Sequence, residues 1–367
     1  MSSGGAEGPP VQPSRAERTG AANRRRRIEA IVAVVLVIGG LAFAGIQLTG
    51  DRGGGPSPTP SPSASGAEAP SSMLALSITG TSNALLAVVG SGGGRVPAAV
   101  VTPPGMTVIV PGQGDATTQA VQTLPGASMR VAVSNVVGAW SAHYAVMTLG
   151  GFAQTVDRAG GITVDLPDIF ILGAQALGPG PTHLTGAQVG SLLRQRSDDA
   201  AARWAAVLQG FLAVPPPVQP GDLTEADDVA AAIAALSSAA GAAAQAVPTE
   251  EVGGTATIAA EPALDQLVGG LFGTPVPVRT LIQNGNGEPG IGEAVATRIL
   301  PAGFRVVLSQ NATSFDHATT QIIAIGTAHL PEAQRAKAAL GVGTVAVTQV
   351  PSGLADVTIV VGRDFRG

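Results

Sequence analysis

An uncharged apolar run near the N-terminus constrains this chain more than any other feature. Residues 30–48 read AIVAVVLVIGGLAFAGIQL and contain no charged side chain. As a helix, such a run extends roughly 28 Å, close to the roughly 30 Å hydrocarbon core of a bilayer. The arginines Arg24 to Arg27 come shortly before it, and positively charged flanks stay on the cytoplasmic side. The pattern predicts a single transmembrane helix over 30–48, with a cytoplasmic N-terminus and the bulk of the chain outside the membrane.

A cleaved signal peptide is the alternative interpretation of the same run. Ala42-Phe43-Ala44 fits the small-residue cleavage pattern, with cleavage after Ala44. The apolar run continues past this point to Leu48, which favours an anchor over a signal. Either interpretation places the bulk of the chain on the extracytoplasmic side.

The segments on either side of this run lack the apolar pattern of a folded domain. Residues 1–29 are rich in Gly, Ser, Pro, Ala and Arg, and residues 49–72 in Pro, Ser and Gly. Chains of such composition bury too little apolar surface to offset the entropy of ordering, and Pro/Ser/Gly segments act as spacers. We expect a disordered cytoplasmic tail over 1–29 and a linker over 49–72.

Composition excludes several classes of protein. Charged residues make up only 12% of the chain, and cysteine is absent. A coiled coil needs charged e and g positions and a nucleic-acid binder needs basic patches, so neither is expected, and no nucleic-acid partner is predicted. The absence of cysteine excludes disulfides, thiol catalysis and Cys-ligated metal sites.

The chain after the linker alternates short strands with helices. In residues 73–272, short apolar runs separated by Gly, Pro, Ser and Asn predict strands, and segments with N-cap and glycine stop signals predict helices. The strands are expected at 74–78, 84–89, 96–101, 107–110, 144–148 and 162–166, and the helices at 116–124, 134–138, 152–159, 185–194, 201–212, 224–246 and 262–272. This alternation predicts a mixed α/β (α+β) fold for the domain.

A second, smaller domain is expected over 273–367. Its pattern has the order βαββαββ, with strands at 276–283, 304–309, 321–325, 344–347 and 356–361 and helices at 291–300 and 332–340. The segment Gly285–Gly290 has the G-x-G-x-x-G spacing of a dinucleotide site. However, Glu288 would put a carboxylate beside the pyrophosphate, and the next strand ends in Ser309 where an acid is needed for the ribose. A tight strand-to-helix turn that needs positive φ is therefore the favoured interpretation.

Four stretches of the chain resemble two known domain families. His143–Asp168 reads HYAVMTLGGFAQTVDRAGGITVDLPD, and Thr182–Leu212 reads THLTGAQVGSLLRQRSDDAAARWAAVLQGFL. The matching residues are Phe152, Val156, Asp157, Gly160, Gly161, Val164 and Pro167 in the first and Leu184, Gly186, Leu192, Arg194, Arg196 and Phe211 in the second. On these residues the larger domain resembles the LytR–CpsA–Psr family. Residues 276–307 and 354–365 resemble the LytR C-terminal domain that is often appended to such proteins.

The resemblance implies a role in the cell envelope. Members of the family are phosphotransferases that move a glycopolymer from a polyprenyl-pyrophosphate carrier onto peptidoglycan with a divalent cation. Arginines hold the pyrophosphate and an apolar tunnel holds the lipid tail. The protein's part in such phosphoryl transfer is positioning and charge neutralisation. The resemblance therefore implies a cell-wall glycopolymer or its lipid carrier as partner, with Mg²⁺ as cofactor if the chain is catalytic.

The sequence departs from the family where the chemistry is expected. Ser82 and Asn83 stand in the place of a carboxylate that serves the metal, and Pro104 and Gly105 in that of an Arg-Asp pair. A lone hydroxyl cannot supply the charge that a metal ion needs. No catalytic residue is assigned. The remaining candidates are Arg194, Arg196 and Arg203 for pyrophosphate binding and Asp198 and Asp199 for a metal.

The residue pattern by itself allows a plainer role for two of these arginines. Arg194 and Arg196 lie at the expected C-terminal end of a helix, where arginine is stabilised by the helix dipole and solvated. The resemblance instead favours contact with a phosphate or another polyanion, because the guanidinium group binds phosphate oxygens in pairs.

The sequence thus predicts a membrane-anchored envelope protein that is a non-catalytic binder or regulator in cell-wall glycopolymer attachment. Residues 276–367 are the expected contact for an envelope protein partner. The alternative is an active glycopolymer–peptidoglycan phosphotransferase in which Asp115 and Arg95 supply the missing groups. A third interpretation is a wall-facing structural domain without a ligand.

Overall fold

A computed structural model describes residues 72–80, 85–91, 95–195, 199–254 and 256–367, all within one compact unit, Thr59–Gly367. The tail expected at 1–29, the transmembrane helix expected at 30–48 and nearly all of the linker lie outside the described residues. Among the residues that are described, no helix combines the length and the apolar character needed to cross a membrane. The mixed α/β class is confirmed.

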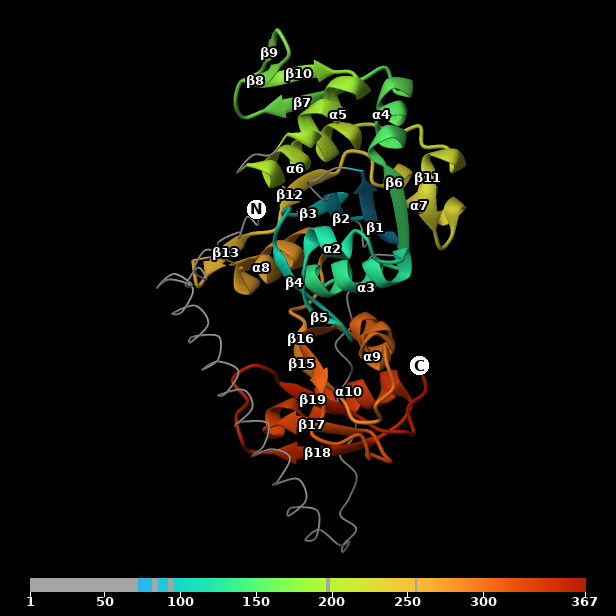
Figure 1. Cartoon of the computed structure of the whole chain (residues 1–367), viewed down its shortest axis with the longest axis vertical. Coiled ribbons are helices and arrows are strands. Elements are labelled where there is room, and N and C mark those ends of the chain that lie inside the picture. Colours follow the sequence, from blue (N-terminus) through green and yellow to red (C-terminus); the bar gives the residue numbers. More distant parts are fainter. Residues whose placement is uncertain (1–71, 81–84, 92–94, 196–198, 255) are drawn as a thin grey trace, which may run out of the picture. The chain divides into compact units, whose positions relative to one another are not determined.

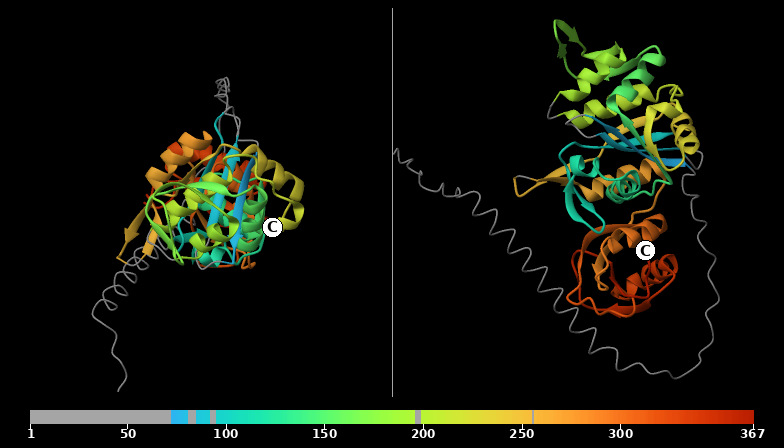
Figure 2. Two further views of the ribbon diagram at one scale, coloured as in Figure 1. Left: turned by 90° about the horizontal axis from the view of Figure 1, so that it is seen from above. Right: turned by 45° about the vertical axis from the view of Figure 1, so that its right-hand side comes forward.

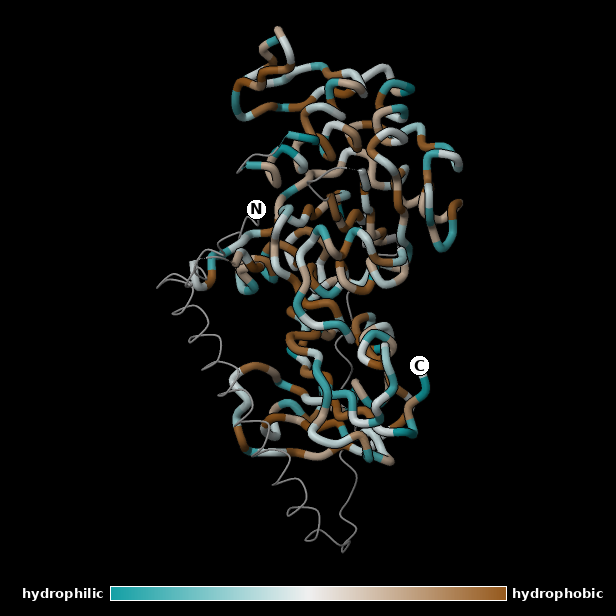
Figure 3. Tube along the Cα trace, in the orientation of Figure 1, coloured by the Kyte–Doolittle hydropathy of each residue, from teal (hydrophilic) through white to brown (hydrophobic). Residues whose placement is uncertain are grey.

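The larger of the two main sheets has six strands, in the order β11-β6-β1-β2-β3-β12 (Figure 1). Its central strand β1 pairs antiparallel with β2 and parallel with β6. The strand bounds are β1 Ser72–Thr79, β2 Leu85–Ser91, β3 Ala98–Thr102, β6 His143–Thr148, β11 Leu223–Ala226 and β12 Ala243–Ala246. β1 is apolar from Met73 to Leu76 and buried from Met73 to Ile78, as expected for a strand that is covered on both faces. Figure 3 shows hydrophobic residues in the region of this sheet.

Helices cover both faces of this sheet, as the alternate residues of β1 show (Figure 2). Leu74 and Leu76 pack with helices on one face, and Met73 and Ala75 pack with helices on the other. The first face holds α4 (Leu149–Arg158), α5 (Gly186–Arg194), α6 (Ala200–Phe211) and α7 (Val229–Ser238), and the second holds α3 (Gly126–Val137) and α8 (Glu261–Phe272). We call these the α5 face and the α3 face.

Two small hairpins lie beyond the α5 face, and two beyond the α3 face or next to it (Figure 1). On the α5 side, β7 pairs with β10, and β8 pairs with β9. On the α3 side, β4 pairs with β5, and β13 pairs with β14. Strand β14 contacts β4. Their bounds are β4 Thr107–Val110, β5 Gly114–Thr117, β7 Ile162–Leu166, β8 Phe170–Leu172, β9 Gln175–Leu177, β10 Gly180–Leu184, β13 Thr249–Val252 and β14 Ala256–Ala259. A short helix, α2 (Thr118–Val121), follows β5.

Local signals explain why the run from β6 to β7 folds as strand, helix and strand. Thr148 caps α4, because its side chain accepts a hydrogen bond from the Gly151 amide. Gly160 and Gly161 follow the helix with φ of 83° and 95°. A Cβ on Gly161 would lie 2.5 Å from the His183 ring nitrogen Nε2, so this turn requires glycine both for its φ and for the close approach of β10.

The C-terminal sheet has five strands in the order β16-β15-β19-β17-β18. All its strand pairs are parallel except β17–β19, which is antiparallel. The elements are β15 Val278–Asn284, α9 Ile291–Ile299, β16 Phe304–Asn311, β17 Gln321–Ile325, α10 Leu330–Leu340, β18 Thr344–Thr348 and β19 Val357–Val361. Apart from short 3-10 turns, this is the predicted order βαββαββ, and the predicted positive-φ turn is present at Gly287 and Gly290, with φ of 77° and 78°.

Polar side chains link the C-terminal sheet to α3 and α8. Asn135, which is 2% exposed, donates to the Val306 carbonyl at 2.9 Å and accepts from the Val306 amide at 2.7 Å. The Arg305 guanidinium pairs with Asp265 of α8 at 2.7 Å and is itself 4% exposed. Buried charges are tolerated only when paired, so these contacts fix β16 against the preceding helices.

The segment 224–246 corrects a sequence prediction. A single alanine-dominated helix was expected, but the chain forms β11, α7 and β12. Asp228 caps α7 by accepting from the Ala231 amide, and Gly241, with φ of 79°, follows the helix. Ala243–Ala246 then pairs parallel with β3. A run of alanines carries no hydrophobic periodicity, so pairing with β3, and not the local pattern, decides its conformation. The helix expected at 116–124 likewise begins as β5.

Candidate functional site

The structure places Arg194 at the C-terminal end of α5 and Arg203 in the second turn of α6. A capping box formed by Thr185 and Gln188 starts α5, and the chain leaves the helical conformation at Gln195. Arg194 is exposed. The other candidates in this segment, Arg196 and Asp198, lie outside the described residues.

Arg203 and Asp199 form an ion pair with each other. Arg203 Nε donates to Asp199 Oδ2 at 2.9 Å, across one turn of α6, and the guanidinium carbon lies 5.5 Å from the centre of the Phe170 ring. These contacts hold Arg203 between the start of α6 and β8. The pair therefore uses a proposed pyrophosphate ligand and a proposed metal ligand to neutralise each other.

An exposed apolar strand lies next to the end of α5. Ile169 and Ile171 are 62% and 57% exposed, on either side of the buried Phe170. The Gln195 side chain donates to the Ile171 carbonyl at 3.4 Å, which ties the end of α5 to β8. We define the α5–β8 surface by Arg194, Ile169 and Ile171. It combines a cationic group with apolar side chains, a combination that suits an amphiphile with an anionic head.

Asp115 and Arg95, which an active phosphotransferase would use in place of the missing groups, lie elsewhere in the fold. Asp115 belongs to the β4–β5 hairpin, whose Ala116 packs on the α3 face. Arg95 donates to the Gly270 carbonyl of α8 at 2.7 Å, also on the α3 face. Arg194 follows residues of α5 that are buried on the opposite face. The sheet thus separates Asp115 and Arg95 from Arg194.

The segment in which the resemblance expects an Arg-Asp pair forms a tight turn. Gly105 has φ of 78°, and its amide donates to Gln119 Oε1 at 3.1 Å. Thr118 Oγ1 donates to the Pro103 carbonyl at 3.0 Å, which fixes the turn against α2. Ser82 and Asn83, which stand in the place of the carboxylate that serves the metal, lie outside the described residues. Within the described part of the chain, no three His, Cys, Asp or Glu side chains gather as a metal site requires.

Two neighbouring charged residues of the run His143–Asp168, Asp157 and Arg158, have structural partners. Asp157 Oδ1 accepts from the Gly186 amide at 2.7 Å, which holds the first turn of α5. Arg158 forms two hydrogen bonds with Asp222, at 2.8 and 2.9 Å. Asp222 is 6% exposed, and its hydrogen bonds with Arg158 lower the pKa of its carboxyl group. The sequence predicted neither pairing, because each joins residues that are distant in the chain.

A polar cluster at the β6–β11 edge was also not predicted from the sequence. The Tyr144 hydroxyl donates to Glu225 at 3.1 Å, and the Tyr144 amide donates to Asp227 at 3.0 Å. Asp227 also faces Arg130 of α3 and the ring of His143, at 3.6 and 3.3 Å. Burial raises the pKa of the Tyr144 hydroxyl, and the bond to Glu225 raises it further. Because these groups bind one another, the cluster joins α3 to the edge of the sheet.

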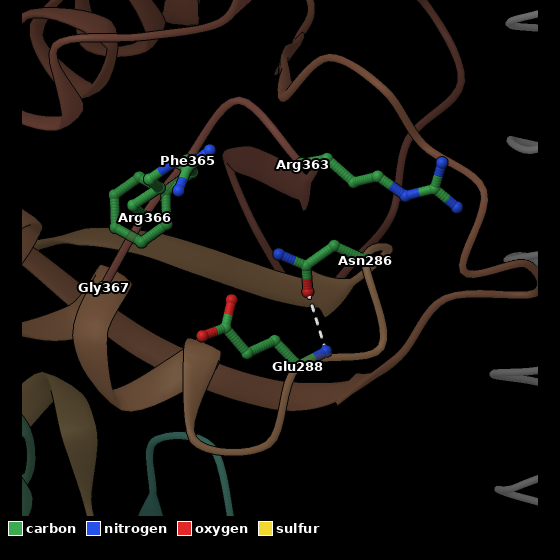
Figure 4. Close-up of a pocket in the computed structure, with 6 residues that line it drawn as sticks. All are labelled: Asn286, Glu288, Arg363, Phe365, Arg366 and Gly367. Carbon is green, nitrogen blue, oxygen red and sulfur yellow. Dashed lines mark hydrogen bonds between the residues drawn. The ribbon is translucent and has the colours of Figure 1, made fainter.

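A separate open cavity of about 380 Å³ lies at the Gly-rich turn of the C-terminal sheet (Figure 4). Its lining residues are Asn286, Glu288, Arg363, Phe365, Arg366 and Gly367. The Glu288 amide donates to Asn286 Oδ1 at 2.9 Å, which shapes the turn, and the Arg363 side chain pairs with Asp316 at 3.1 Å. The Glu288 carboxylate lines the cavity, where it disfavours a bound pyrophosphate.

The C-terminal part of the chain matches a known family model. Residues 277–365 match the family model LytR_C, described as LytR cell envelope-related transcriptional attenuator. The C-terminal resemblance is confirmed. No curated protein matches the chain.

Several solved structures are similar to about half of this chain. A LytR-Csp2A-Psr enzyme from Actinomyces oris is 19% identical, with a TM-score of 0.43, and the match covers 55% of this chain and 89% of that one. B. subtilis TagU and TagV are 15% and 13% identical, with TM-scores of 0.41 and 0.43, and each match covers 55% of this chain and 95% of theirs.

Proposed function

We propose that this chain is a cell-envelope protein that binds a cell-wall glycopolymer through its polyprenyl-pyrophosphate carrier without transferring the polymer. In this proposal residues 30–48 anchor the chain in the cell membrane, with the N-terminus in the cytoplasm and the bulk of the chain outside. The family model matched by residues 277–365 is described as cell envelope-related, which supports this setting.

The observation that carries the proposal is the α5–β8 surface. Arg194 is exposed at the C-terminal end of α5, which Gln195 ties to β8, and Ile169 and Ile171 are more than half exposed. Guanidinium groups bind phosphate oxygens with charge-assisted hydrogen bonds. Exposed isoleucines lose unfavourable contact with water when an apolar chain covers them. A polyprenyl pyrophosphate offers both chemical features in one molecule, an anionic head joined to a branched hydrocarbon tail.

Binding without transfer is proposed because the groups that transfer would need are replaced or paired. Phosphoryl transfer depends on cations and a metal that neutralise the developing charge. Pro104 and Gly105 form a turn in place of the expected Arg-Asp pair, and Asp199 is paired with Arg203. One exposed arginine next to an apolar strand is enough to hold a head group, but not to stabilise its displacement.

Binding can be tested with the full chain in nanodiscs and a fluorescent polyprenyl-pyrophosphate glycolipid. Arg194→Gln removes the charge and Ile171→Ser removes the apolar contact, while Arg363→Gln removes an arginine that is 61% exposed and belongs to the C-terminal domain. We expect Arg194→Gln and Ile171→Ser each to weaken binding about 5- to 10-fold, about 1 to 1.4 kcal/mol. Arg363→Gln should bind like the wild type. Equal affinity for all four proteins would refute the α5–β8 surface as the binding site.

A further inference from the structure

One edge of the C-terminal sheet is formed by β18, and within the described chain no strand pairs with its outer side (Figure 1). The Thr344 amide donates to the Thr320 carbonyl at 2.9 Å, and the Thr348 carbonyl accepts from the Gly326 amide at 2.7 Å. Both of these groups therefore face β17. Because backbone direction alternates along a strand, the amides and carbonyls of Val345 and Val347 face outward.

This edge lacks the features that normally block strand pairing. Residues 338–355, between Lys337 and Asp356, contain no charged side chain, and β18 itself contains no proline. Ala346 is exposed and Val347 is 41% exposed. Soluble proteins usually protect an edge strand with lysine, proline or a bulge, because an open edge is a template for another strand. An unprotected edge of β-branched residues fits a strand that pairs with another chain.

The sequence of β18 is a palindrome, TVAVT. In an antiparallel pair of two such strands centred on Ala346, each residue faces its own kind: Thr344 opposite Thr348, Val345 opposite Val347, and Ala346 opposite itself. This register also brings the outward amides and carbonyls of Val345 and Val347 opposite one another, for about four hydrogen bonds. Backbone direction and side-chain pairing therefore select the same register.

We propose that β18 pairs antiparallel with β18 of a second copy of this chain, about a two-fold axis that passes beside Ala346. The two five-stranded sheets then form one continuous sheet. A second copy is the fitting partner because a two-fold interface places identical residues opposite one another, and a strand without charges meets itself without repulsion. The contact is small, so the association is weak and depends on concentration.

Cysteine cross-linking tests the register directly, because the chain has no cysteine of its own. In the proposed pair, the two Ala346 Cα atoms lie about 4.5 Å apart, within the roughly 4.4 to 6.8 Å that a disulfide spans. Under mild oxidation, full-length Ala346→Cys should give a covalent dimer. Thr344→Cys should not, because its two copies are offset by roughly 14 Å along the strands. A mixture of Thr344→Cys and Thr348→Cys should again cross-link. The proposal is overturned if Ala346→Cys stays monomeric, or if Thr344→Cys alone cross-links equally well.

A charge exchange at the same position provides an independent test. Ala346→Lys and Ala346→Glu place like charges opposite one another in the proposed dimer, at an exposed position that tolerates them in the monomer. We expect the wild type to dimerise with rising concentration in sedimentation experiments, each variant alone to associate at least tenfold more weakly, and their mixture to recover association. Equal association of all three single proteins, or no recovery in the mixture, would contradict the β18 pairing.

Discussion

Helix α4 of the run His143–Asp168 packs on the same face of the sheet as α5 and α6, which carry Arg194 and Arg203, but the two regions have different roles. In the first, Phe152 is buried in the core and Asp157 holds the start of α5. In the second, Arg194 is exposed beside an apolar strand. Residues of the first run that carry the family resemblance thus build the scaffold, whereas in the second region Arg194 is available to a ligand. Resemblance in a scaffold does not by itself bring the family's chemistry.

The largest loss of stability is expected from a substitution in the buried core of the run His143–Asp168. The rings of Phe152 and Phe211 lie 4.6 Å apart between their centres. Phe152→Ala leaves a cavity between α4 and α6, and should lower the free energy of unfolding by about 3 to 5 kcal/mol. Urea unfolding followed by the fluorescence of Trp204, which is 1% exposed in the same core, measures the loss. Phe152→Leu, which keeps most of the volume, should lose much less.

The ion pair between Arg158 and Asp222 makes a smaller contribution that depends on pH. The pKa of Asp222 is lowered in the folded state, so as pH falls the unfolded chain binds a proton at this carboxyl group before the folded chain does. The stabilisation is therefore fully present above the ordinary Asp pKa of about 3.9. It is lost as pH falls through the lower pKa of the folded state. Asp222→Asn should cost about 1 to 3 kcal/mol at pH 7. The difference between the wild type and Asp222→Asn in urea unfolding should narrow towards pH 3. A difference that is constant with pH would contradict the ion pair.

Substitutions of Asp157 test whether this residue stabilises the fold or binds the ligand. Asp157→Ala removes the acceptor for the Gly186 amide and should cost about 1 kcal/mol of stability. Asp157→Asn retains an acceptor oxygen and should cost less. Neither variant should change glycolipid affinity once folded, so a large loss of binding in Asp157→Asn would show that this residue belongs to the site.

The smallest effect on stability is expected at Arg194. Its side chain is exposed at the end of α5, so Arg194→Gln should change the free energy of unfolding by no more than about 0.5 kcal/mol. Its glycolipid affinity should nevertheless fall, as proposed above. Thermal unfolding measured alongside binding separates the two effects. A destabilised Arg194→Gln protein would make this arginine part of the scaffold as well.

Local signals in the sequence account for the elements that were predicted well. The C-terminal order βαββαββ follows from apolar runs separated by glycine stops, such as Gly303 and Gly341, which both have positive φ. The region 224–246 was mispredicted because alanine favours a helix locally, whereas the pairing of Ala243–Ala246 with β3 makes its last part a strand. The β8–β9 hairpin was missed because its strands are only three residues long.

The candidate site was predictable in part. Arg194 could be selected from the sequence, and the structure exposes it. The Asp199–Arg203 spacing of four residues on one helix is a recognisable ion-pair signal, yet the resemblance led to Asp199 being taken as a metal ligand. The roles of Asp157 and Asp222 depend on contacts with distant parts of the chain, which no local pattern contains.

The central claim is that this chain binds its lipid-linked polymer and does not transfer it. The most direct test gives the full chain in nanodiscs a labelled polyprenyl-pyrophosphate glycolipid, Mg²⁺ and peptidoglycan, and measures binding and release of the polymer from its carrier in the same sample. The account predicts saturable binding with no release above that of empty nanodiscs. Release that depends on the wild-type chain and disappears in Arg194→Gln would contradict it and establish an active phosphotransferase.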